Sequence, residues 1–357
     1  MADYIYKTFF LITKNMKHII RHFVLAFSTI LSISVTTAQS FKAEDIRIAN
    51  PAAGIELAGT LTSPVEGAPK AVIVLATGSG AQNRDEEIMG HKPFKVIAET
   101  LSGHGYAVLR MDDRGTGESG GDFACATTDD FCTDIAAGVA EMTKRHPAVK
   151  TGILGHSEGG TIAIKEAVNN PECDFIITLG APAWAGDSII MSQARAMAVG
   201  LMGKWDAETH QREILDLVKS SINDIQLRMA LTVKLSEMSG QSATIPQVKE
   251  ALMKQIDVLA SPWYRQTIKY DPASDIIKIK KPWLALNGDR DTQVLPGNLQ
   301  TIKDLNPGAE TMLLEKHNHL FQRCTTGLMN EYAGINEDIS EETLAAILLW
   351  LDNSIGR

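Results

Sequence analysis

The chain has 357 residues, of which 44% are hydrophobic and 22% charged, with 28 glycines and 13 prolines. This composition is that of an ordinary globular protein, and it excludes a disordered chain, a collagen-like chain and a small disulfide-stabilised domain. The net charge of −9 argues against a nucleic-acid or anionic-membrane partner, because both require a basic surface.

The N-terminal segment has the pattern of an export signal. A basic stretch at 17–22 precedes an apolar run at 23–35, and small residues follow. A run of about 13 residues is shorter than the roughly 20 that a membrane span needs. We therefore predict that residues 1–38 are a signal peptide, that the protein is exported (periplasmic or secreted), and that it is not stably inserted in a membrane after signal removal. An uncleaved anchor is the alternative, and the start at Met1 or Met16 is open.

The cysteines do not predict a metal site. No pair has C-x-x-C spacing, no cysteine lies beside a histidine with ligand spacing, and H-E-x-x-H is absent. We expect neither a metal nor an organic cofactor. Export would allow disulfides in any of three pairings, and buried free thiols are equally compatible with the sequence. The four residues concerned are Cys125, Cys132, Cys173 and Cys324.

Strands and helices alternate along the rest of the chain. An antiparallel hairpin is predicted over 45–48 and 55–62, across an Asn-Pro-Ala-Ala-Gly turn. Apolar runs and alternation predict the later strands at 71–76, 106–111, 151–154, 175–179, 283–286 and 311–314. Helical periodicity predicts helices at 94–101, 131–142, 159–168 and 344–351, the last with Ser340 as N-cap. This order predicts an α/β fold with a mostly parallel sheet and helices on both faces.

The interval 180–282 interrupts this alternation, because it contains no convincing buried strand. A connection between a strand and a helix normally needs only a few residues. The sequence here predicts helices instead, at 188–201, 207–217, 223–235 and 247–259. We therefore predict a helical cap inserted at 183–272, between a first part of the core at 39–182 and a second part at 273–357.

A candidate nucleophile lies in Gly155-His156-Ser157-Glu158-Gly159. This G-x-S-x-G sequence follows a predicted strand and opens a predicted helix, which is the context that gives the motif meaning. The tight turn lifts the serine above the sheet, and the glycines tolerate the strain. The alternative is an ordinary serine in a glycine-rich turn.

A serine hydroxyl needs a base, and the base needs an acid to orient it. His319 follows the last predicted strand and is preferred to His317, because it lies farther out in the loop. Asp291 is preferred to Asp289 in the loop after the strand at 283–286, where either could instead be a solvated turn residue. The chain order of serine, aspartate and histidine is the one expected for a serine hydrolase of α/β type.

Two further loops follow predicted strands. Thr77-Gly78-Ser79-Gly80 lies where an oxyanion donor is expected, so we assign the backbone N–H groups of Ser79 and Glu158 as the oxyanion hole. A nucleotide-binding G-x-G-x-x-G is excluded there, because Asn83 occupies the third glycine position. The charges of the loop at 112–117 are predicted to tie loops together.

Taken together, these residues resemble the α/β-hydrolase superfamily, and closely a bacterial serine-esterase branch related to dienelactone hydrolases and serine-aminopeptidase-like hydrolases. One departure is Thr77, where many relatives have histidine. The resemblance implies an α/β-hydrolase fold with nucleophile Ser157, acid Asp291 and base His319. It is carried by LAGTLTSP (57–64), TGSGAQNRDEE (77–87), HKPFKVIAETL (91–101), VLRMDDRGTGES (108–119), TTDDFCTDI (127–135), GHSEGG (155–160), LALNGDRDTQV (284–294) and NHLFQRCTTG (318–327).

The expected activity is carboxylic-ester hydrolysis through an acyl-enzyme, on a small-molecule ester with a small-to-medium acyl group. An amidase or aminopeptidase could use the same three residues, but it would need a group that captures a peptide terminus. Glu208 and Glu237 are candidates, although both are ordinary residues for an exposed helix. A non-catalytic binding protein is a third possibility, against which the intact serine, aspartate and histidine argue. The sequence does not define an oligomeric state.

Overall fold

The structure is a computed structural model that describes residues 41–220, 223–240, 242 and 245–356. The predicted signal peptide lies outside these residues. The described part contains an eight-stranded sheet with strand order β1-β2-β4-β3-β5-β6-β7-β8. Its strands are β1 (Phe41–Asn50), β2 (Ile55–Pro64), β3 (Val72–Ala76), β4 (Ala107–Met111), β5 (Thr151–His156), β6 (Phe175–Leu179), β7 (Trp283–Gly288) and β8 (Glu310–Leu314).

The predicted strands are all present. The hairpin of β1 and β2 is antiparallel, as predicted, and β2 also pairs antiparallel with β4. From β4 across to β8 the strands are parallel. Parallel strands have their carboxyl ends at one edge of the sheet, so the loops after β3, β5, β7 and β8 meet there. That edge carries every residue assigned above to catalysis.

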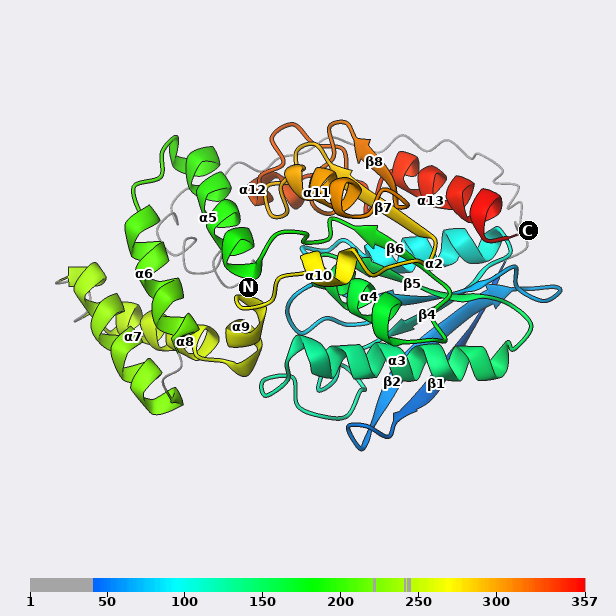
Figure 1. Cartoon of the computed structure of the whole chain (residues 1–357), viewed down its shortest axis with the longest axis horizontal. Coiled ribbons are helices and arrows are strands. Elements are labelled where there is room, and N and C mark those ends of the chain that lie inside the picture. Colours follow the sequence, from blue (N-terminus) through cyan, green and yellow to red (C-terminus); the bar gives the residue numbers. More distant parts are fainter. Residues whose placement is uncertain (1–40, 221–222, 241, 243–244, 357) are drawn as a thin grey trace, which may run out of the picture.

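Helices cover both faces of the sheet, which confirms the predicted fold class (Figure 1). On one face, α2 (Pro93–Gly103) and α13 (Glu341–Ser354) pack against the strands. On the other, α3 (Thr128–Arg145), α4 (Glu158–Asn169) and α11 (Gly297–Leu305) do so. The short helix α10 (Ala273–Ile276) contributes Ile276 to this second core. Ser340 caps α13 by accepting from the Thr343 amide, which confirms the predicted N-cap.

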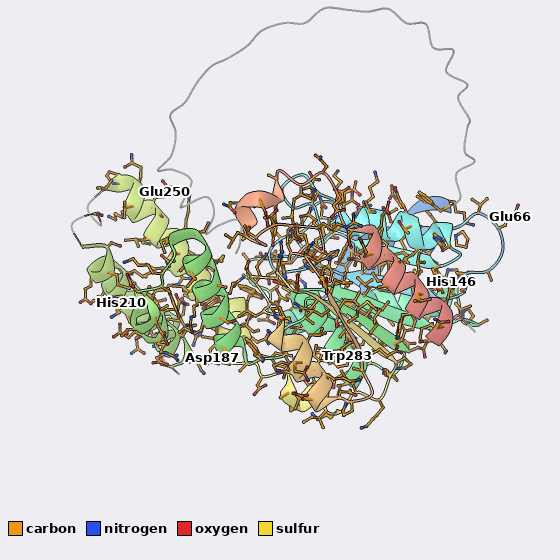
Figure 2. All side chains as sticks on the ribbon, turned by 90° about the horizontal axis from the view of Figure 1, so that it is seen from above. Glu66, His146, Asp187, His210, Glu250 and Trp283 are labelled. Atoms are coloured by element: carbon orange, nitrogen blue, oxygen red, sulfur yellow. The ribbon has the colours of Figure 1, made fainter. Side chains whose placement is uncertain are left out.

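A separate group of helices lies at one end of the molecule, on the left in Figure 1. Viewed from above, it carries Asp187, His210 and Glu250, and the sheet with Trp283 lies beside it (Figure 2). This group has a separate apolar core, in which Leu227, Leu231 and Leu235 repeat every fourth residue. Its elements are α5 (Gly186–Met202), α6 (Glu208–Lys219), α7 (Asp224–Ser239), α8 (Pro246–Leu259) and α9 (Pro262–Thr267).

The described residues of 183–272 contain these helices and no strand. The sequence therefore places helices correctly in this interval, which had lacked a strand pattern. The boundaries of the predicted cap stay a prediction.

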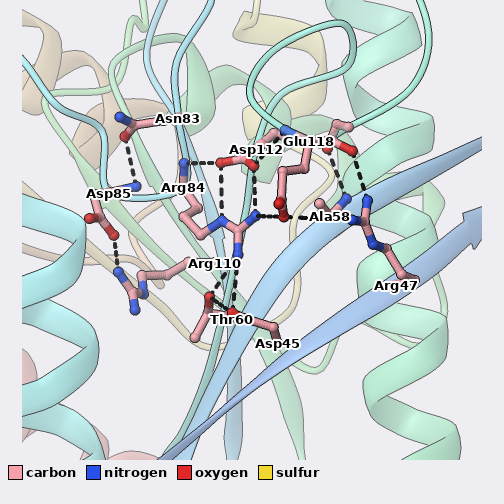
Figure 3. A network of polar contacts seen from close by, with 11 residues as sticks. Asp45, Arg47, Ala58, Thr60, Asn83, Arg84, Asp85, Arg110, Asp112 and Glu118 are labelled. Carbon is pink, nitrogen blue, oxygen red and sulfur yellow. Dashed lines mark hydrogen bonds and ion pairs between the residues drawn. The ribbon is translucent and has the colours of Figure 1, made fainter.

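Buried ion pairs connect the loops at the sheet edge, as the charges at 112–117 predicted. Arg84, in the loop between β3 and α2, binds the Asp112 carboxylate with two guanidinium nitrogens at 3.1 and 2.7 Å (Figure 3). The Arg84 amide donates to the same carboxylate at 2.8 Å. Glu118 and Asp45 flank the guanidinium, each at 3.2 Å. Arg114 pairs with buried Asp134 at 2.7 Å. These bonds fix the loop that follows β3 against the loop that follows β4.

All four cysteines are free thiols, so none of the three disulfide pairings is formed. Cys132 and Cys173 are buried, while Cys125 is exposed. Among the described residues, no helix combines the length and the apolar character that crossing a bilayer would require.

Candidate active site

Ser157 occupies the sharp turn between β5 and α4, with φ 54° and ψ −116°. A positive φ at a residue with a side chain is strained, at a cost of about 1–3 kcal/mol. The glycines of the motif are required by close backbone contacts. A Cβ on Gly155 would lie 1.9 Å from the Gly159 carbonyl oxygen, and a Cβ on Gly159 would lie 1.9 Å from that of Ala76. The turn therefore holds the serine at the carboxyl edge of the sheet.

Asp291 and His319 form a buried pair at the same edge. The His319 Nδ1 lies 2.7 Å from the Asp291 Oδ2, and the two side chains are 4% and 0% exposed. The other oxygen, Oδ1, accepts from the amides of Gln293 and Val294, both at 2.8 Å. Since Oδ2 can only accept when the carboxyl is ionised, it selects the tautomer with a proton on Nδ1. The Nε2 is then free to take a proton from a nucleophile.

The competing residues make other contacts. The His317 ring bonds to the Glu315 carbonyl oxygen and to the Ser340 hydroxyl, both at 2.7 Å. Asp289 is exposed and accepts from the Lys316 amide at 2.6 Å. The geometry therefore couples Asp291 with His319, and it leaves His317 and Asp289 in contacts that hold the loop.

Ser157 and His319 line one cavity of about 460 Å³, together with Ser79 and Glu158. This volume lies within the range of small-molecule sites. A large part of the wall is apolar and comes from both the sheet loops and the helical group: Trp184, Ile189, Ile190, Trp263, Val294, Leu320 and Met329. The structure thus brings the assigned nucleophile, base and oxyanion residues to one cavity, with Asp291 behind the base.

Two carboxylates, those of Glu86 and Asp113, form hydrogen bonds with the loop after β3. The Gly78 amide donates to Glu86 Oε1 at 2.6 Å, so that it is already engaged and the Ser79 amide is the next along the chain. Asp113 accepts from the Thr77 hydroxyl at 2.6 Å and from the Gln82 amide at 2.8 Å. Enclosure of the Asp113 carboxyl raises its pKa to about 8. Thr77, at the position of the family's histidine, therefore anchors this loop.

The second assigned donor is the Glu158 amide. As the first residue of α4, it has no intrahelical acceptor, and the helix dipole adds a favourable field for a nearby anion. Ser79 and Glu158 line the same cavity as Ser157, so their assignment as the oxyanion hole stays a prediction.

Comparisons with known proteins agree with this architecture. The family model of the serine aminopeptidases S33 matches residues 68–232. Esterase EstD of Thermotoga maritima is 23% identical over 79% of this chain and 60% of its own length. A monoglyceride lipase homolog of Monkeypox virus is 30% identical over 38% of this chain and 46% of its own length. The chain thus spans less than two thirds of these relatives. The solved structure of the Pyrococcus furiosus esterase Pf2001 has a TM-score of 0.55 and 18% identity, covering 88% of this chain and 92% of that one.

The chain has the α/β-hydrolase fold, and the family match over residues 68–232 agrees with it. In this α/β hydrolase, Ser157 follows β5, Asp291 follows β7 and His319 follows β8, which is the order of the resemblance.

The sequence did not predict a structural role for the Glu158 side chain, which lies in this site. The Glu158 carboxylate accepts from the Thr128 hydroxyl at 2.7 Å and from the Trp263 indole at 2.6 Å. Burial raises the pKa of Glu158, while these two bonds and one from the Ser79 hydroxyl act against the rise. Trp263 belongs to α9, so this carboxylate ties the helical group to the serine turn. A charged residue directly after the serine, in an otherwise small-residue motif, was the available signal.

A second unforeseen pair lies beneath the serine. The Glu86 Oε1 and the His156 Nδ1 are 2.8 Å apart, and both side chains are buried. Both residues stand in segments that carry the family resemblance, but nothing in their spacing shows that they meet. Among the described residues, no group of three or more His, Cys, Asp or Glu side chains could hold a metal ion.

Proposed function

We propose that this α/β hydrolase is a serine carboxylic-ester hydrolase that acts through an acyl-enzyme. The observation that carries the proposal is the cavity that the strained Ser157 and the Asp291-oriented His319 both line. A serine on a tight strand-to-helix turn, with an imidazole whose tautomer is fixed by a carboxylate, is suited to nucleophilic attack on a carbonyl.

In the proposed reaction, Ser157 Oγ attacks the ester carbonyl carbon while His319 Nε2 takes its proton. The amides of Ser79 and Glu158 donate to the oxyanion of the tetrahedral intermediate. His319 then gives the proton to the departing alcohol, which leaves the acyl group on Ser157. Water attacks this acyl-enzyme with His319 again as base, which releases the acid and restores the serine.

The expected substrates are esters with small-to-medium acyl groups. A cavity of about 460 Å³ with a large apolar wall accommodates an acyl chain of that size. The names of the two curated relatives, an esterase and a monoglyceride lipase homolog, support ester chemistry.

The test is hydrolysis of p-nitrophenyl esters from acetate to decanoate, with wild type and Ser157→Ala. We expect turnover of the shorter esters and a loss of at least about 10³-fold in the variant. Ser188→Ala, an exposed serine on α5, is the matched control and should keep wild-type turnover. Retention of turnover by Ser157→Ala would overturn the proposal.

An aminopeptidase or amidase is the second candidate, favoured by the match of the S33 serine aminopeptidase model over 68–232. Aminoacyl p-nitroanilides, assayed beside the esters, separate the two. We expect kcat/KM to be higher for the ester than for the anilide of the same acyl group by at least about 10³-fold. A preference for the anilide would replace the esterase assignment with the peptidase one.

Export is proposed on the sequence pattern of residues 1–38 alone. Expression of the full chain in a bacterial host, followed by cell fractionation and intact-mass measurement, tests it. The mature protein is expected outside the cytoplasm with a mass that begins near residue 39. An uncleaved chain in the membrane fraction would favour the anchor instead.

A further inference from the structure

A second histidine–carboxylate pair lies directly beneath the nucleophile, and the reaction above does not use it. Glu86 Oε1 lies 2.8 Å from His156 Nδ1, and His156 Nε2 lies 2.9 Å from the His319 carbonyl oxygen. The Glu86 and His156 side chains are 1% and 6% exposed. The rings of His156 and His319 are tilted against each other, with centroids 4.7 Å apart.

The pair connects three loops whose relative positions matter for catalysis. Glu86 also accepts the Gly78 amide at 2.6 Å, and Gly78 directly precedes the assigned oxyanion donor Ser79. His156 is the residue before Ser157, and it bonds to the backbone of His319 itself. The loops after β3, β5 and β8 therefore meet at one carboxylate and one imidazole.

Proton counting links the protonation states of the two residues. A carbonyl oxygen only accepts, so the Nε2 of His156 must carry a proton. When Glu86 is ionised it also only accepts, so the Nδ1 then carries a proton too and the ring is an imidazolium. Burial opposes this charge, but the Glu86 carboxylate and its hydrogen bond outweigh it, so the pKa of His156 is raised. The ion pair is enclosed and shielded from solvent.

The local backbone shows that the contact is built into the turn. Glu86 has a φ of 52°, a strained value for a residue with a side chain. A Cβ on Gly78 would lie 3.1 Å from Glu86 Oε1 and 3.3 Å from the Ser157 Cβ, so the loop passes close to both. The strained backbone at Glu86 thus coincides with the hydrogen bond from the Gly78 amide to its carboxylate.

We propose that Glu86 and His156 are positioning residues, held as a carboxylate–imidazolium pair that keeps the Ser79 amide and the His319 ring aligned on Ser157. This rests on the proposed function, because alignment is defined by the acyl-transfer reaction. The pair touches no reacting atom. It acts through the Gly78 amide and the His319 carbonyl, and its effect is therefore greater on the transition state than on substrate binding.

The first test is kinetic, with Glu86→Gln and His156→Asn. Glu86→Gln removes the charge that holds the imidazolium, and because one oxygen, Oε1, meets both the Gly78 amide and the His156 Nδ1, the glutamine cannot keep both contacts beside a neutral ring. We expect kcat to fall by at least about tenfold with KM changed by less than about threefold, because an oxyanion donor is misplaced while the apolar wall of the cavity is kept. The inhibition constant of butylboronic acid, whose adduct with Ser157 is a tetrahedral anion, should rise by the same factor as kcat/KM falls.

His91→Gln is the matched control. His91 is another buried histidine beside a carboxylate, with Nε2 2.9 Å from the Tyr332 carbonyl oxygen and Nδ1 3.4 Å from Asp338. It does not line the cavity, so its loss should leave kcat within about threefold of wild type. An equal loss in His91→Gln, or a Glu86→Gln enzyme with kcat within threefold of wild type, would overturn the proposal.

The second test does not need turnover. Nitrogen-15 NMR of histidine-labelled wild type should show, at pH 7.5, one ring with both nitrogens protonated, and comparison with His156→Asn assigns it. A singly protonated His156 would overturn the ion pair. If the wild type does not hydrolyse esters, the proposed function fails, while this measurement still decides the state of the pair.

Discussion

Replacing Asp291 with asparagine tests how the base is oriented. Asp291 Oδ1 accepts two amides, those of Gln293 and Val294, and Oδ2 accepts from the His319 Nδ1. The asparagine must keep its oxygen toward the two amides, because its NH₂ group cannot accept from them. Its NH₂ group then faces the histidine and donates to Nδ1. The imidazole is driven to the tautomer with a proton on Nε2, which cannot take one from Ser157.

The size of the effect follows from this inversion. The side chain keeps its shape and its two amide bonds, so the fold is expected to persist. Loss of the correct tautomer in the serine-protease triad reduces kcat by on the order of 10⁴-fold, and we expect a similar factor here. At 1.36 kcal/mol for each tenfold, this is about 5.4 kcal/mol of transition-state stabilisation.

The assay is kcat/KM for p-nitrophenyl butyrate, with thermal melting to confirm folding. Asp289→Asn is the control, because Asp289 is exposed in the same loop and its side chain accepts from the Lys316 amide. It should keep kcat/KM within about threefold. An Asp291→Asn enzyme within tenfold of wild type, or an Asp289→Asn enzyme that loses as much, would refute the assignment of the acid.

Three further predictions concern stability. Trp263→Phe removes a hydrogen bond to the buried Glu158 carboxylate, and urea unfolding should show a loss of about 1.5–3 kcal/mol, whereas an unchanged value would contradict the tie between α9 and the serine turn. Arg84→Met leaves its buried partner unpaired and should cost about 3–5 kcal/mol, against less than about 1 kcal/mol for Arg47→Met, whose pair with Glu118 is 50% and 66% exposed; equal costs would refute the distinction. The pKa of Asp113 is raised to about 8, so between pH 3.8 and 8 the folded chain keeps a proton that the unfolded chain has released. The free energy of unfolding therefore falls as the pH rises through this range. Asp113→Asn should remove this fall, seen as a Tm difference from wild type that grows from about pH 5 to pH 8, and a constant difference would count against it.

Much of the fold could be predicted from the sequence because its signals are local. The buried strands such as 71–76 are continuous apolar runs, and Ser340, as an N-cap residue, indicates the start of α13. The repeated alternation of strand and helix then leaves few topologies. The elements are where the pattern placed them, with ends that differ by a few residues, as expected for helix termini that fray.

The site was only partly predictable. The serine turn has a local motif, and the order of the strand ends restricted the acid and the base to two choices each. The choice of His319 over His317 is settled in geometry by a contact with Asp291, which is 28 residues away along the chain. Glu86 and His156, 70 residues apart, leave no periodic or spacing signal, because their contact exists only when the loops after β3 and β5 meet.

The most direct test of the account is covalent labelling of the nucleophile. The protein is incubated with a fluorophosphonate probe, digested and mapped by mass spectrometry. We expect one adduct, on Ser157, with no labelling of Ser157→Ala and strongly slowed labelling of His319→Gln. An adduct on another serine, or no adduct on a folded wild-type protein, would contradict the claim that these two side chains form a working nucleophile and base.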